Sequence, residues 1–405
     1  MTPSKLVIFE DGGGQWGPIT DLRAVFDLRT GALTSKQRIE CATGLPTSAL
    51  WSARTTLHNL IAAQHQLPVN PAAFDAPVLA VNGRWPGARH ADAVAKLTLG
   101  SALVQRDGQV IAAHLAAQDA STFLNPQGTL GELPAHIRRT TIDDTVLLER
   151  PWHILDGLET NLASDLKKID LPQMNGDDRR VIRFGEHPVY VAEDAVVQPG
   201  AIFNSEQGPI VIESGALVGA LSVLEGPCYV GRGTTIVCHA HIRPNTVIGP
   251  NCKAAGEISF SILHSYSNKA HHGYMGHCLV GQWVNLGAAT NVSNLKNTYG
   301  TVRVQLECET APQDTGRTFN GPIIGDMVRT GIGTRLLTGC CVGTGAMIAH
   351  SGYVPKYVPR MTFLTDRDAC PYQPDKFIAT VRNMMSRRHV QLDPALEERL
   401  RSMMQ

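Results

Sequence analysis

The chain has 405 residues, of which 43% are hydrophobic and 18% are charged, and its 36 Lys and Arg residues balance 36 Asp and Glu residues. This composition is typical of a globular protein, and the length predicts two domains. A formal net charge of zero excludes a global field that would attract nucleic acid or an anionic membrane. We therefore expect no nucleic-acid or membrane partner, and an anionic substrate must be bound by local cations.

The first residues, MTPSKLVIFEDGGG, contain an apolar run far too short for a signal peptide or a membrane span. No later apolar run reaches about 18 residues either. The nine cysteines are scattered and include no CxxC pair. We expect them to be reduced, buried thiols of a cytoplasmic protein.

Strand and helix patterns alternate in the first part of the chain, which predicts an α/β domain over residues 1–185. The run KLVIFE (5–10) predicts a buried strand that leads into a glycine loop, and APVLAVNGRW (76–85) predicts another strand. Residues 48–65 have helical spacing. Residues 102–113 contain two β-type runs around Asp107–Gly108, which predicts a hairpin.

An aliphatic residue recurs every six positions from about residue 187, and small residues, above all Gly, follow many of these positions. This period indicates a parallel β-helix of hexapeptide repeats, in which each coil buries its aliphatic side chains only by stacking on its neighbours. We predict this domain over residues 186–365. The positions that carry the period are Val191, Val197, Ile212, Val218, Leu224, Val230, Ile236, Ile242, Ile248, Val280, Leu286, Ile324, Thr330, Leu336, Val342, Ile348 and Val354.

The remaining residues, 366–405, predict a helical tail. Asp393 followed by Pro394 is typical of a cap and first turn, and marks the start of the last helix.

The six-residue period breaks between about 250 and 300, and polar side chains gather around this break. They are Arg243, Glu257, His264, Asn268, Lys269, His271, His272, Tyr274, Asn285, Asn291, Asn294 and Lys296. Irregular segments on a rigid scaffold are where functional sites are usually carried.

Three interpretations of the histidines remain open from the residues alone. A metal site could use the imidazoles of His239, His241, His271, His272 and His277. The histidines could instead be structural. One of them could also act as a general base near neutral pH, with Arg243 and Lys296 offsetting the charge of a phosphorylated substrate.

The motifs HIRPNTVIGP, YSNKAHHGYMG and LVGQWVNLGAATNVSNLKNTYGTVRV resemble the acetyltransferase half of the bifunctional GlmU enzymes. That family makes UDP-N-acetylglucosamine by acetylating glucosamine 1-phosphate and transferring uridylate to it. The opening FEDGGGQWGPITDLRAVFDLRTGALTSKQRIE and the tail with MMSRR resemble an alternative bacterial branch. In that branch a divergent nucleotidyltransferase-like domain precedes the β-helix.

The resemblance implies a set of roles in the second half of the chain. His271 falls on the general base, with His272 or His264 as alternatives because the register stutters here. The substrate-binding positions, which hold the sugar and its phosphate and orient the histidine, fall on Arg243, Tyr274, Asn285 and Asn294. Ala288 lies near the thioester of acetyl-CoA, the expected cofactor.

Two positions depart from the family pattern. Ser259 stands where the family has a second phosphate-site lysine, so Lys269 or Lys296 would have to compensate. Ile332 stands where the family has a serine that contacts the cofactor.

The first half has weaker motifs. A nucleoside triphosphate needs a glycine loop, cations and usually carboxylates for Mg²⁺. Gly12, Gly13 and Gly14 supply such a loop, and Arg29 and Lys36 resemble basic positions of the alternative branch. Asp11 could bind metal or cap the turn.

The sequence therefore predicts a cytoplasmic transferase with an α/β nucleotidyltransferase-like domain, a left-handed β-helix acyltransferase domain and a helical tail. Its expected ligands are a sugar phosphate, acetyl-CoA and a nucleoside triphosphate with Mg²⁺, without a resident metal, and its expected assembly is a homotrimer. Three alternatives stay open: a nucleotidylyltransferase whose β-helix only forms trimers, a non-catalytic hexapeptide scaffold, and a metal-dependent hydratase of the carbonic anhydrase type.

Overall fold

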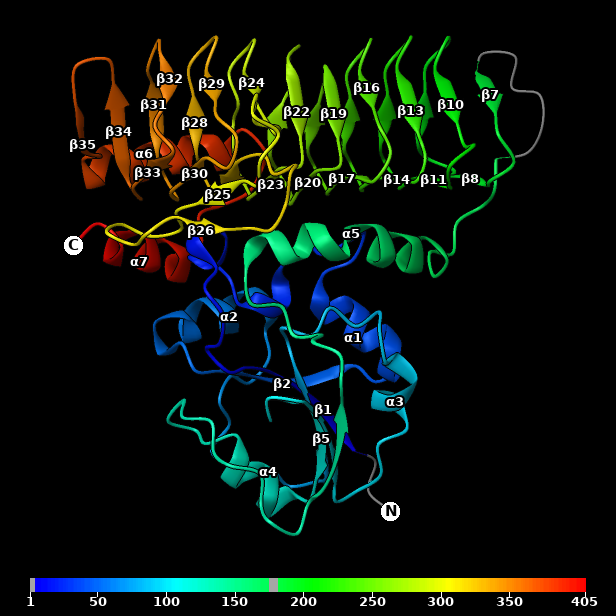
Figure 1. Cartoon of the computed structure of the whole chain (residues 1–405), viewed down its shortest axis with the longest axis vertical. Coiled ribbons are helices and arrows are strands. Elements are labelled where there is room, and N and C mark those ends of the chain that lie inside the picture. Colours follow the sequence, from blue (N-terminus) through cyan, green and yellow to red (C-terminus); the bar gives the residue numbers. More distant parts are fainter. Residues whose placement is uncertain (1–3, 175–180) are drawn as a thin grey trace. The chain divides into compact units, whose positions relative to one another are not determined.

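The computed structural model describes residues 4–174 and 181–405. They form two compact units (Figure 1). The first contains the described residues up to Gln15, Leu22–Arg150 and Asp393–Arg399, and the second contains Trp16–Asp21, Pro151–Leu392 and Leu400–Gln405. The domain bounds at residues 185 and 365 stay predictions.

The first unit is built on a six-stranded sheet with the order β2-β1-β3-β5-β4-β6. Strand β5 runs antiparallel to β3 and β4, whereas the other pairs are parallel. The predicted strands and the predicted hairpin are confirmed by β1, β3, β4 and β5. The strands are β1 (Lys5–Glu10), β2 (Thr47–Ser52), β3 (Val78–Asn82), β4 (Ser101–Gln105), β5 (Val110–Leu115) and β6 (Arg138–Ile142).

Four α-helices accompany this sheet: α1 (Ser35–Thr43), α2 (His58–His65), α3 (Ala91–Ala95) and α4 (Ala117–Phe123). Short 3₁₀ turns span Val25–Asp27 and Thr55–Leu57. Helix α1 begins with a reciprocal capping box between Thr34 and Gln37. The helical prediction for residues 48–65 is wrong in its first part, because Thr47–Ser52 pairs with β1 and is almost fully buried in the sheet.

The second unit is a parallel β-solenoid of left-handed type, with three faces that the chain visits in the order 2, 1, 3 (Figure 1). Face 1 consists of β8 (Val189–Val191), β11 (Ile210–Ile212), β14 (Cys228–Val230), β17 (Thr246–Ile248), β20 (Ile262–Leu263), β23 (Leu279–Val280), β27 (Ile323–Ile324), β30 (Cys341–Val342) and β33 (Tyr357–Val358).

Face 2 has two segments joined where β22 contacts β24. Its strands are β7 (Ile182–Phe184), β10 (Ile202–Asn204), β13 (Val223–Glu225), β16 (His241–Ile242), β19 (Glu257–Ser259), β22 (Tyr274–Gly276), β24 (Asn291–Val292), β29 (Arg335–Leu336) and β32 (Tyr353–Val354).

Face 3 also has two segments, joined by single bridges from Asn268 to Asn285 and from Asn285 to Arg329. Its strands are β9 (Val196–Val197), β12 (Leu217–Val218), β15 (Thr235–Ile236), β18 (Lys253–Ala254), β21 (Asn268–Lys269), β28 (Arg329–Thr330), β31 (Met347–Ala349), β34 (Thr362–Thr365) and β35 (Ala369–Pro371).

The six-residue period is confirmed as the pattern of side chains that point into the solenoid. Ile212, Leu224, Ile236 and Ile248 are fully buried in one continuous core. Lys269 is an exception, because it pairs with Ala254 at one of these inward positions and is only 2% exposed. The break in the period therefore coincides with a cation inside the solenoid.

The regular coils are interrupted by an insertion over residues 295–322, which contains the antiparallel hairpin β25 (Arg303–Val304) and β26 (Gln313–Asp314). Three further helices are α5 (Pro151–Leu166), α6 (Pro374–Ser386) and α7 (Pro394–Ser402), and a 3₁₀ turn spans Gly17–Thr20. The predicted helical tail is confirmed by α6 and α7. The Asp393 carboxylate accepts the Ala395 N–H, as expected of a cap.

All nine cysteines are free thiols. Five are buried, but the prediction of burial is wrong for Cys41, Cys238, Cys308 and Cys370, which are exposed. None of the helices in the described part of the chain is long and apolar enough to cross a membrane.

Candidate active site

The two adjacent histidines lie on the edge of the solenoid where face 3 turns into face 2. Residues 270–273 link β21 to β22, and the side chains of His271 and His272 are both exposed there. Gly273 has a φ of +120°, and a Cβ atom on it would lie 2.3 Å from the carbonyl oxygen of Thr290. Only glycine therefore fits, and the turn lies directly against the corresponding turn of the next coil.

That neighbouring turn contains Ala288. The Ala288 carbonyl accepts the Gly333 N–H at 2.7 Å, so the same edge continues into the following coil. The predicted base His271 and the predicted thioester position Ala288 thus occupy adjacent coils on one edge.

Lys269 supports the histidine turn from inside the solenoid. Its Nζ atom donates to the carbonyl oxygens of Ala255 and His271, each at 3.0 Å. Burial lowers the pKa of Lys269 to about 8. Its inward position also means that Lys269 does not offer a cation to a ligand on the surface, so it does not compensate for Ser259.

Face 2 carries three of the predicted substrate-binding residues. Arg243 is about half-exposed and forms an ion pair with Glu257 at 3.0 Å. Two strands further along, the amide nitrogen of Asn294 donates to the phenol oxygen of Tyr274 at 3.0 Å. Burial raises the pKa of Tyr274, so this phenol stays protonated at neutral pH.

The same amide nitrogen of Asn294 also donates to Nδ1 of His277 at 2.8 Å. The His277 ring is stacked between Phe260 and Phe319, with centroid distances of 4.7 and 5.2 Å. Burial, and then the charge of Arg317, lowers the pKa of His277 to about 4. His277 is therefore a neutral imidazole whose proton is on Nε2.

The sequence prediction included His277 only in a metal site. An asparagine that orients a histidine was expected, but the structure pairs Asn294 with His277, whereas His271 lies in an exposed turn. The signal that could have found this pair is the position of His277 directly after the face 2 strand that carries Tyr274.

Two predicted substrate residues lie elsewhere. Asn285 is on face 3, where its side-chain oxygen accepts from Asn268 at 3.4 Å. Lys296 is in the insertion and donates to the carbonyl of Thr301. One copy of the chain therefore places Arg243, Tyr274 and Asn294 together on face 2 and leaves Asn285 around the edge.

The remaining histidine interpretations can be compared with the structure. His264 is 4% exposed, so its ring is not available to a surface ligand as His271 and His272 are. Within residues 4–174 and 181–405, no group of three or more His, Cys, Asp or Glu side chains is placed to hold a metal ion.

In the first unit, the glycine loop is fixed by a buried ion pair. Both oxygens of Asp11 accept from the Arg84 guanidinium, at 2.8 and 2.6 Å, and one of them also accepts the Gly13 N–H. Burial alone would raise the pKa of Asp11, but Arg84 outweighs it, so the pKa lies below its usual value. A Cβ atom on Gly13 would lie 2.8 Å from the guanidinium, so the loop packs closely on Arg84.

Gly12 and Gly14 have φ values of +75° and +82°, in the left-handed region that glycine adopts without strain. The two predicted cations after the loop have protein partners. Arg29 is buried and donates to the carbonyl of Ala32, and Lys36 pairs with Glu40 at 2.7 Å. Their roles in nucleotide binding stay predictions.

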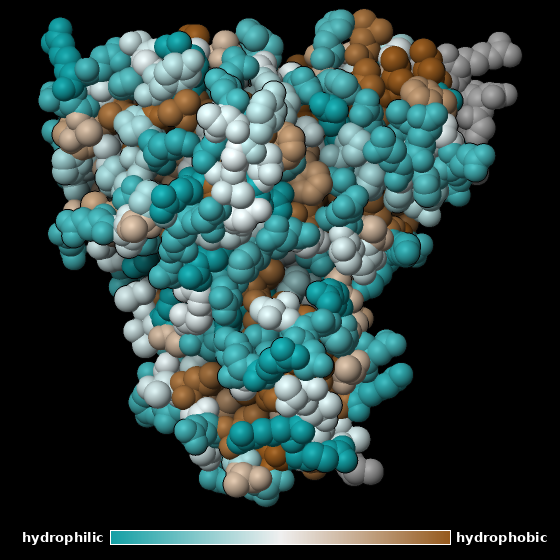
Figure 2. Space-filling model, in the orientation of Figure 1, coloured by the Kyte–Doolittle hydropathy of each residue, from teal (hydrophilic) through white to brown (hydrophobic). Residues whose placement is uncertain are grey.

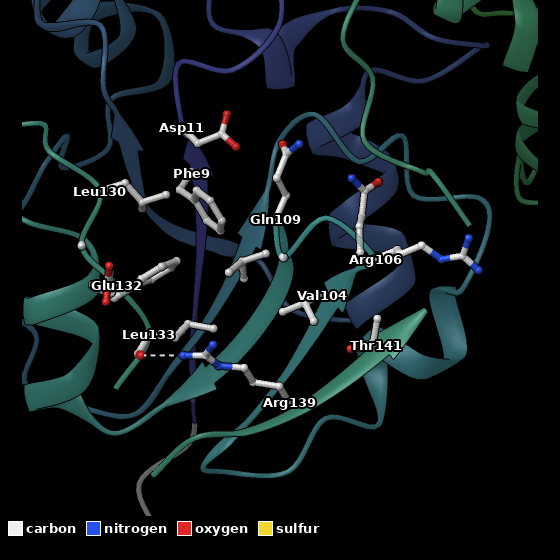
Figure 3. A pocket seen from close by; sticks show the side chains of 15 residues that line it. Phe9, Asp11, Val104, Arg106, Gln109, Leu130, Glu132, Leu133, Arg139 and Thr141 are labelled. Atoms are coloured by element: carbon white, nitrogen blue, oxygen red, sulfur yellow. Dashed lines mark hydrogen bonds between the residues drawn. The ribbon is translucent and has the colours of Figure 1, made fainter. Parts of the chain in front are cut away.

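A cavity of about 520 Å³ opens beside this loop, at the edge where β1, β4 and β6 have their carboxyl ends (Figure 3). Ligands of open α/β sheets bind at this edge. Phe9 and Val104 form an apolar floor. Arg106, Glu132 and Arg139 also line the cavity, and no motif in the sequence had indicated them. The Arg106 side chain is directed away from the cavity and pairs with Asp143 at 2.9 Å, whereas Arg139 donates to the carbonyl of Leu133 at 2.9 Å (Figure 3).

Residues 6–172 match the family model of sugar nucleotidyl transferases. Proteins described as "Bifunctional protein GlmU" are similar to this chain: that of Jannaschia sp. (strain CCS1) is 28% identical over 172 residues, covering 42% of this chain and 33% of its own length. The protein of that name from Methanocaldococcus jannaschii is 32% identical over 221 residues, covering 54% and 47%. The resemblance seen in the motifs is confirmed by these matches.

The chain thus spans between a third and a half of these two relatives. Among solved structures, the polySia-specific acetyltransferase NeuO is 16% identical over 52% of this chain and 96% of its own, with a TM-score of 0.25. A similarity this low supports no statement about activity.

Proposed function

We propose that this chain is a bifunctional enzyme of sugar-nucleotide synthesis. The solenoid transfers an acetyl group from acetyl-CoA to the amine of glucosamine 1-phosphate. The first unit then transfers uridylate to the sugar 1-phosphate, which gives UDP-N-acetylglucosamine. The observation that carries this proposal is the edge between faces 3 and 2, where exposed His271 lies one coil from Ala288 and beside Tyr274 and Asn294 on face 2.

The acetyl transfer assigns one task to each group. His271 accepts a proton as the sugar amine attacks the thioester carbonyl, so a C–N bond forms and the C–S bond breaks to release the CoA thiol. A general base typically contributes ~10²–10⁴-fold in rate. Arg243 provides a cation for the 1-phosphate, and the register of β16 and β19 places Ser259 next to it on face 2.

The acyl donor would lie along the edge from Ala288 towards Ile332. Ile332 is 85% exposed and directly precedes Gly333, whose N–H binds the Ala288 carbonyl. An apolar side chain here would contact the methylene groups of a CoA arm, in place of the hydroxyl contact that the family pattern has. Isoleucine in place of the family's serine at position 332 is therefore compatible with an acyl-CoA donor.

Asn285 lies on face 3, whereas the other predicted substrate residues lie on face 2, so one copy of the chain does not bring them to the same ligand. A second copy of the chain would complete the site. Exposed apolar side chains flank the same edge on the first coils: Ile182 on face 2 is 57% exposed, Val196 on face 3 is 52% exposed, and Leu221 in the turn between them is 55% exposed. Figure 2 shows hydrophobic side chains gathered over this end of the solenoid. Monomers rarely leave such patches uncovered, which supports the homotrimer.

In the first unit, the cavity beside the glycine loop would hold the nucleotide. Arg139 lines it and would offset phosphate charge. Asp11 does not fit as a ligand of Mg²⁺, because both of its oxygens are taken by Arg84. We assign Asp11 to anchoring the loop, and no step is assigned to a metal.

The test uses the purified full-length chain with glucosamine 1-phosphate and acetyl-CoA, and follows free thiol. Thiol release that depends on the sugar phosphate is the expected result. Adding UTP and Mg²⁺ should then release pyrophosphate. Pyrophosphate from UTP and N-acetylglucosamine 1-phosphate without any thiol release would instead favour a nucleotidylyltransferase with a purely structural solenoid. If neither thiol nor pyrophosphate is released, a non-catalytic scaffold is favoured.

A further inference from the structure

A second cavity, of about 430 Å³, lies on a different edge of the solenoid from the histidine turn. It opens where face 1 turns into face 3, and α6 and the residues after it form its other wall. This volume is within the ~300–1,000 Å³ of small-molecule sites. The family model does not cover this part of the chain, and of the residues that line the cavity only Asn285 is also expected in the acetyl-transfer site.

Cations dominate the lining of this cavity. Lys253 and Arg329 come from face 3, and Arg387 and Arg388 follow α6. Among the residues that the structure describes, no Asp or Glu lines the cavity. Within the described ranges, none of the four side chains forms an ion pair, although Arg388 donates to the side-chain oxygen of Asn268 at 2.8 Å. Like charges held together without counter-charges raise the free energy of the folded protein.

The solenoid side of the cavity is a single column of outward positions. Lys253 pairs with Asn268, Asn268 bridges to Asn285, and Asn285 bridges to Arg329. Because neighbouring strands are about 4.8 Å apart, the backbone positions of the two cations lie about 14 Å apart with two amides between them. Amides donate hydrogen bonds without adding charge, so the column offers donors along its length.

Proximity to a helix end accounts for part of this cluster only. Cations after the last turn of α6 are favoured by the helix dipole, which suits Arg387 and Arg388. That argument does not apply to Lys253 and Arg329, which stand on β-strands. Burial lowers the pKa of Arg329, the Tyr372 phenol offsets this only in part, and repulsion from Arg387 adds to the lowering.

We propose that this cavity binds an anion with at least two phosphate groups. The amides and guanidinium groups would donate to the phosphate oxygens, as in other phosphate sites. The stacked pair Tyr266 and Trp283, 4.2 Å apart and nearly parallel, forms the apolar side of the cavity. The site lies on another edge than His271, and the proposal does not depend on acetyl or uridylyl transfer.

The test is isothermal titration of the full-length chain with inorganic pyrophosphate, with orthophosphate and sulfate as comparison ions. We expect pyrophosphate to bind at least 10-fold more tightly than orthophosphate. Arg329→Gln and Arg387→Gln should each weaken this binding at least 10-fold. Arg382→Gln, which removes the same charge from an exposed position of α6 outside the cavity, should leave it unchanged.

Any pyrophosphate that binds to the first unit would still bind in both variants, so only the binding that the variants lose is assigned to this cavity. Equal affinity of wild type and Arg329→Gln overturns the proposal, as does equal binding of sulfate and pyrophosphate, which would indicate an adventitious ion only. Melting temperatures of the variants check that they fold. Competition by UDP or by CoA for the Arg329-dependent site then distinguishes a nucleotide from a coenzyme as the source of the pyrophosphate group.

Discussion

The side-chain amide of Asn294 donates to Nδ1 of His277 at 2.8 Å while its other N–H reaches the Tyr274 phenol at 3.0 Å. One amide thus fixes the tautomer of a buried imidazole and the position of a ring on face 2. We expect Asn294→Ala to leave the His277 and Tyr274 acceptors without this donor. It should lower the free energy of unfolding by about 1–3 kcal/mol and raise the KM for the sugar phosphate roughly 10-fold.

Urea unfolding and steady-state kinetics measure both effects. Asn297→Ala, on an exposed part of the insertion, is the matched control and should change neither. An unchanged KM in Asn294→Ala would show that the hydrogen bonds of Asn294 to His277 and Tyr274 are purely structural.

His277 makes stability depend on pH. Its pKa is about 4 in the folded chain and about 6.5 when unfolded, so between these values the unfolded chain binds more protons. The contribution of His277 is complete above pH 6.5 and is lost as the pH falls towards 4. His277→Phe, whose ring can take the place between Phe260 and Phe319, should remove this loss, which is on the order of 2 kcal/mol between pH 6.5 and pH 5. The comparison is the difference between wild-type and variant unfolding free energies at pH 7.5 and pH 5; parallel changes in the two proteins would contradict it.

The two exposed histidines of the edge turn are predicted to differ in function. His271→Ala should lower the rate of acetyl transfer ~10²–10⁴-fold, whereas His272→Ala should lower it less than about 10-fold. Neither should change uridylyl transfer or the melting temperature, because both side chains are exposed. If His272→Ala is the more damaging change, the base has been assigned to the wrong histidine of the pair.

Lys269 is predicted to act on acetylation through the turn that it supports. Lys269→Met keeps a long side chain at the inward position but removes the two hydrogen bonds to Ala255 and His271. We expect acetyl transfer to fall about 10-fold with little loss of stability at pH 7, because the buried charge is removed at the same time. Lys376→Met, on the exposed side of α6, is the control.

The lowered pKa of Lys269 gives this variant a second signature. Between pH 8 and 10.5 the unfolded chain holds a proton that the folded chain has released, so Lys269 makes stability rise with pH in that window. The wild-type free energy of unfolding minus that of Lys269→Met should therefore increase from pH 7.5 to pH 10. A constant difference would place the Lys269 ammonium in a solvated environment.

The ion pair of the glycine loop is predicted to matter for the first unit alone. Arg84→Gln leaves the Asp11 carboxylate without its buried partner, which should cost about 3 kcal/mol and lower uridylyl transfer at least 10-fold. Arg89→Gln, which breaks an exposed pair with Asp144, should cost less than about 1 kcal/mol. Acetyl transfer measured on the same preparations should remain at the wild-type level, and a parallel loss would contradict an independent role for the loop.

Much of the fold follows directly from the sequence, because a repeated side-chain period reports local structure. Coils of equal length bring every sixth side chain to an inward position, as at Ile212, Leu224 and Ile236. The period of six therefore predicts the solenoid without knowledge of its contacts. The strand that carries Trp51 was missed, because helical spacing in residues 48–65 outweighed a pairing with β1 that only the tertiary structure shows.

The candidate site is a different case. The motif around His271 indicated which stretch carries polar chemistry, and the fold determined how those groups meet. Asn294 reaches His277 because two coils stack, and Asn285 pairs with Arg329 although the whole insertion over residues 295–322 lies between them in the chain. Lys269 falls in the interior because the period breaks there, and Arg387 joins Arg329 because α6 packs on face 3. The sequence alone determined the repeating coil, because the coil depends on residues that are near one another in the chain. Only the tertiary structure decided which side chains share an edge, because coils of unequal length shift the register between distant residues.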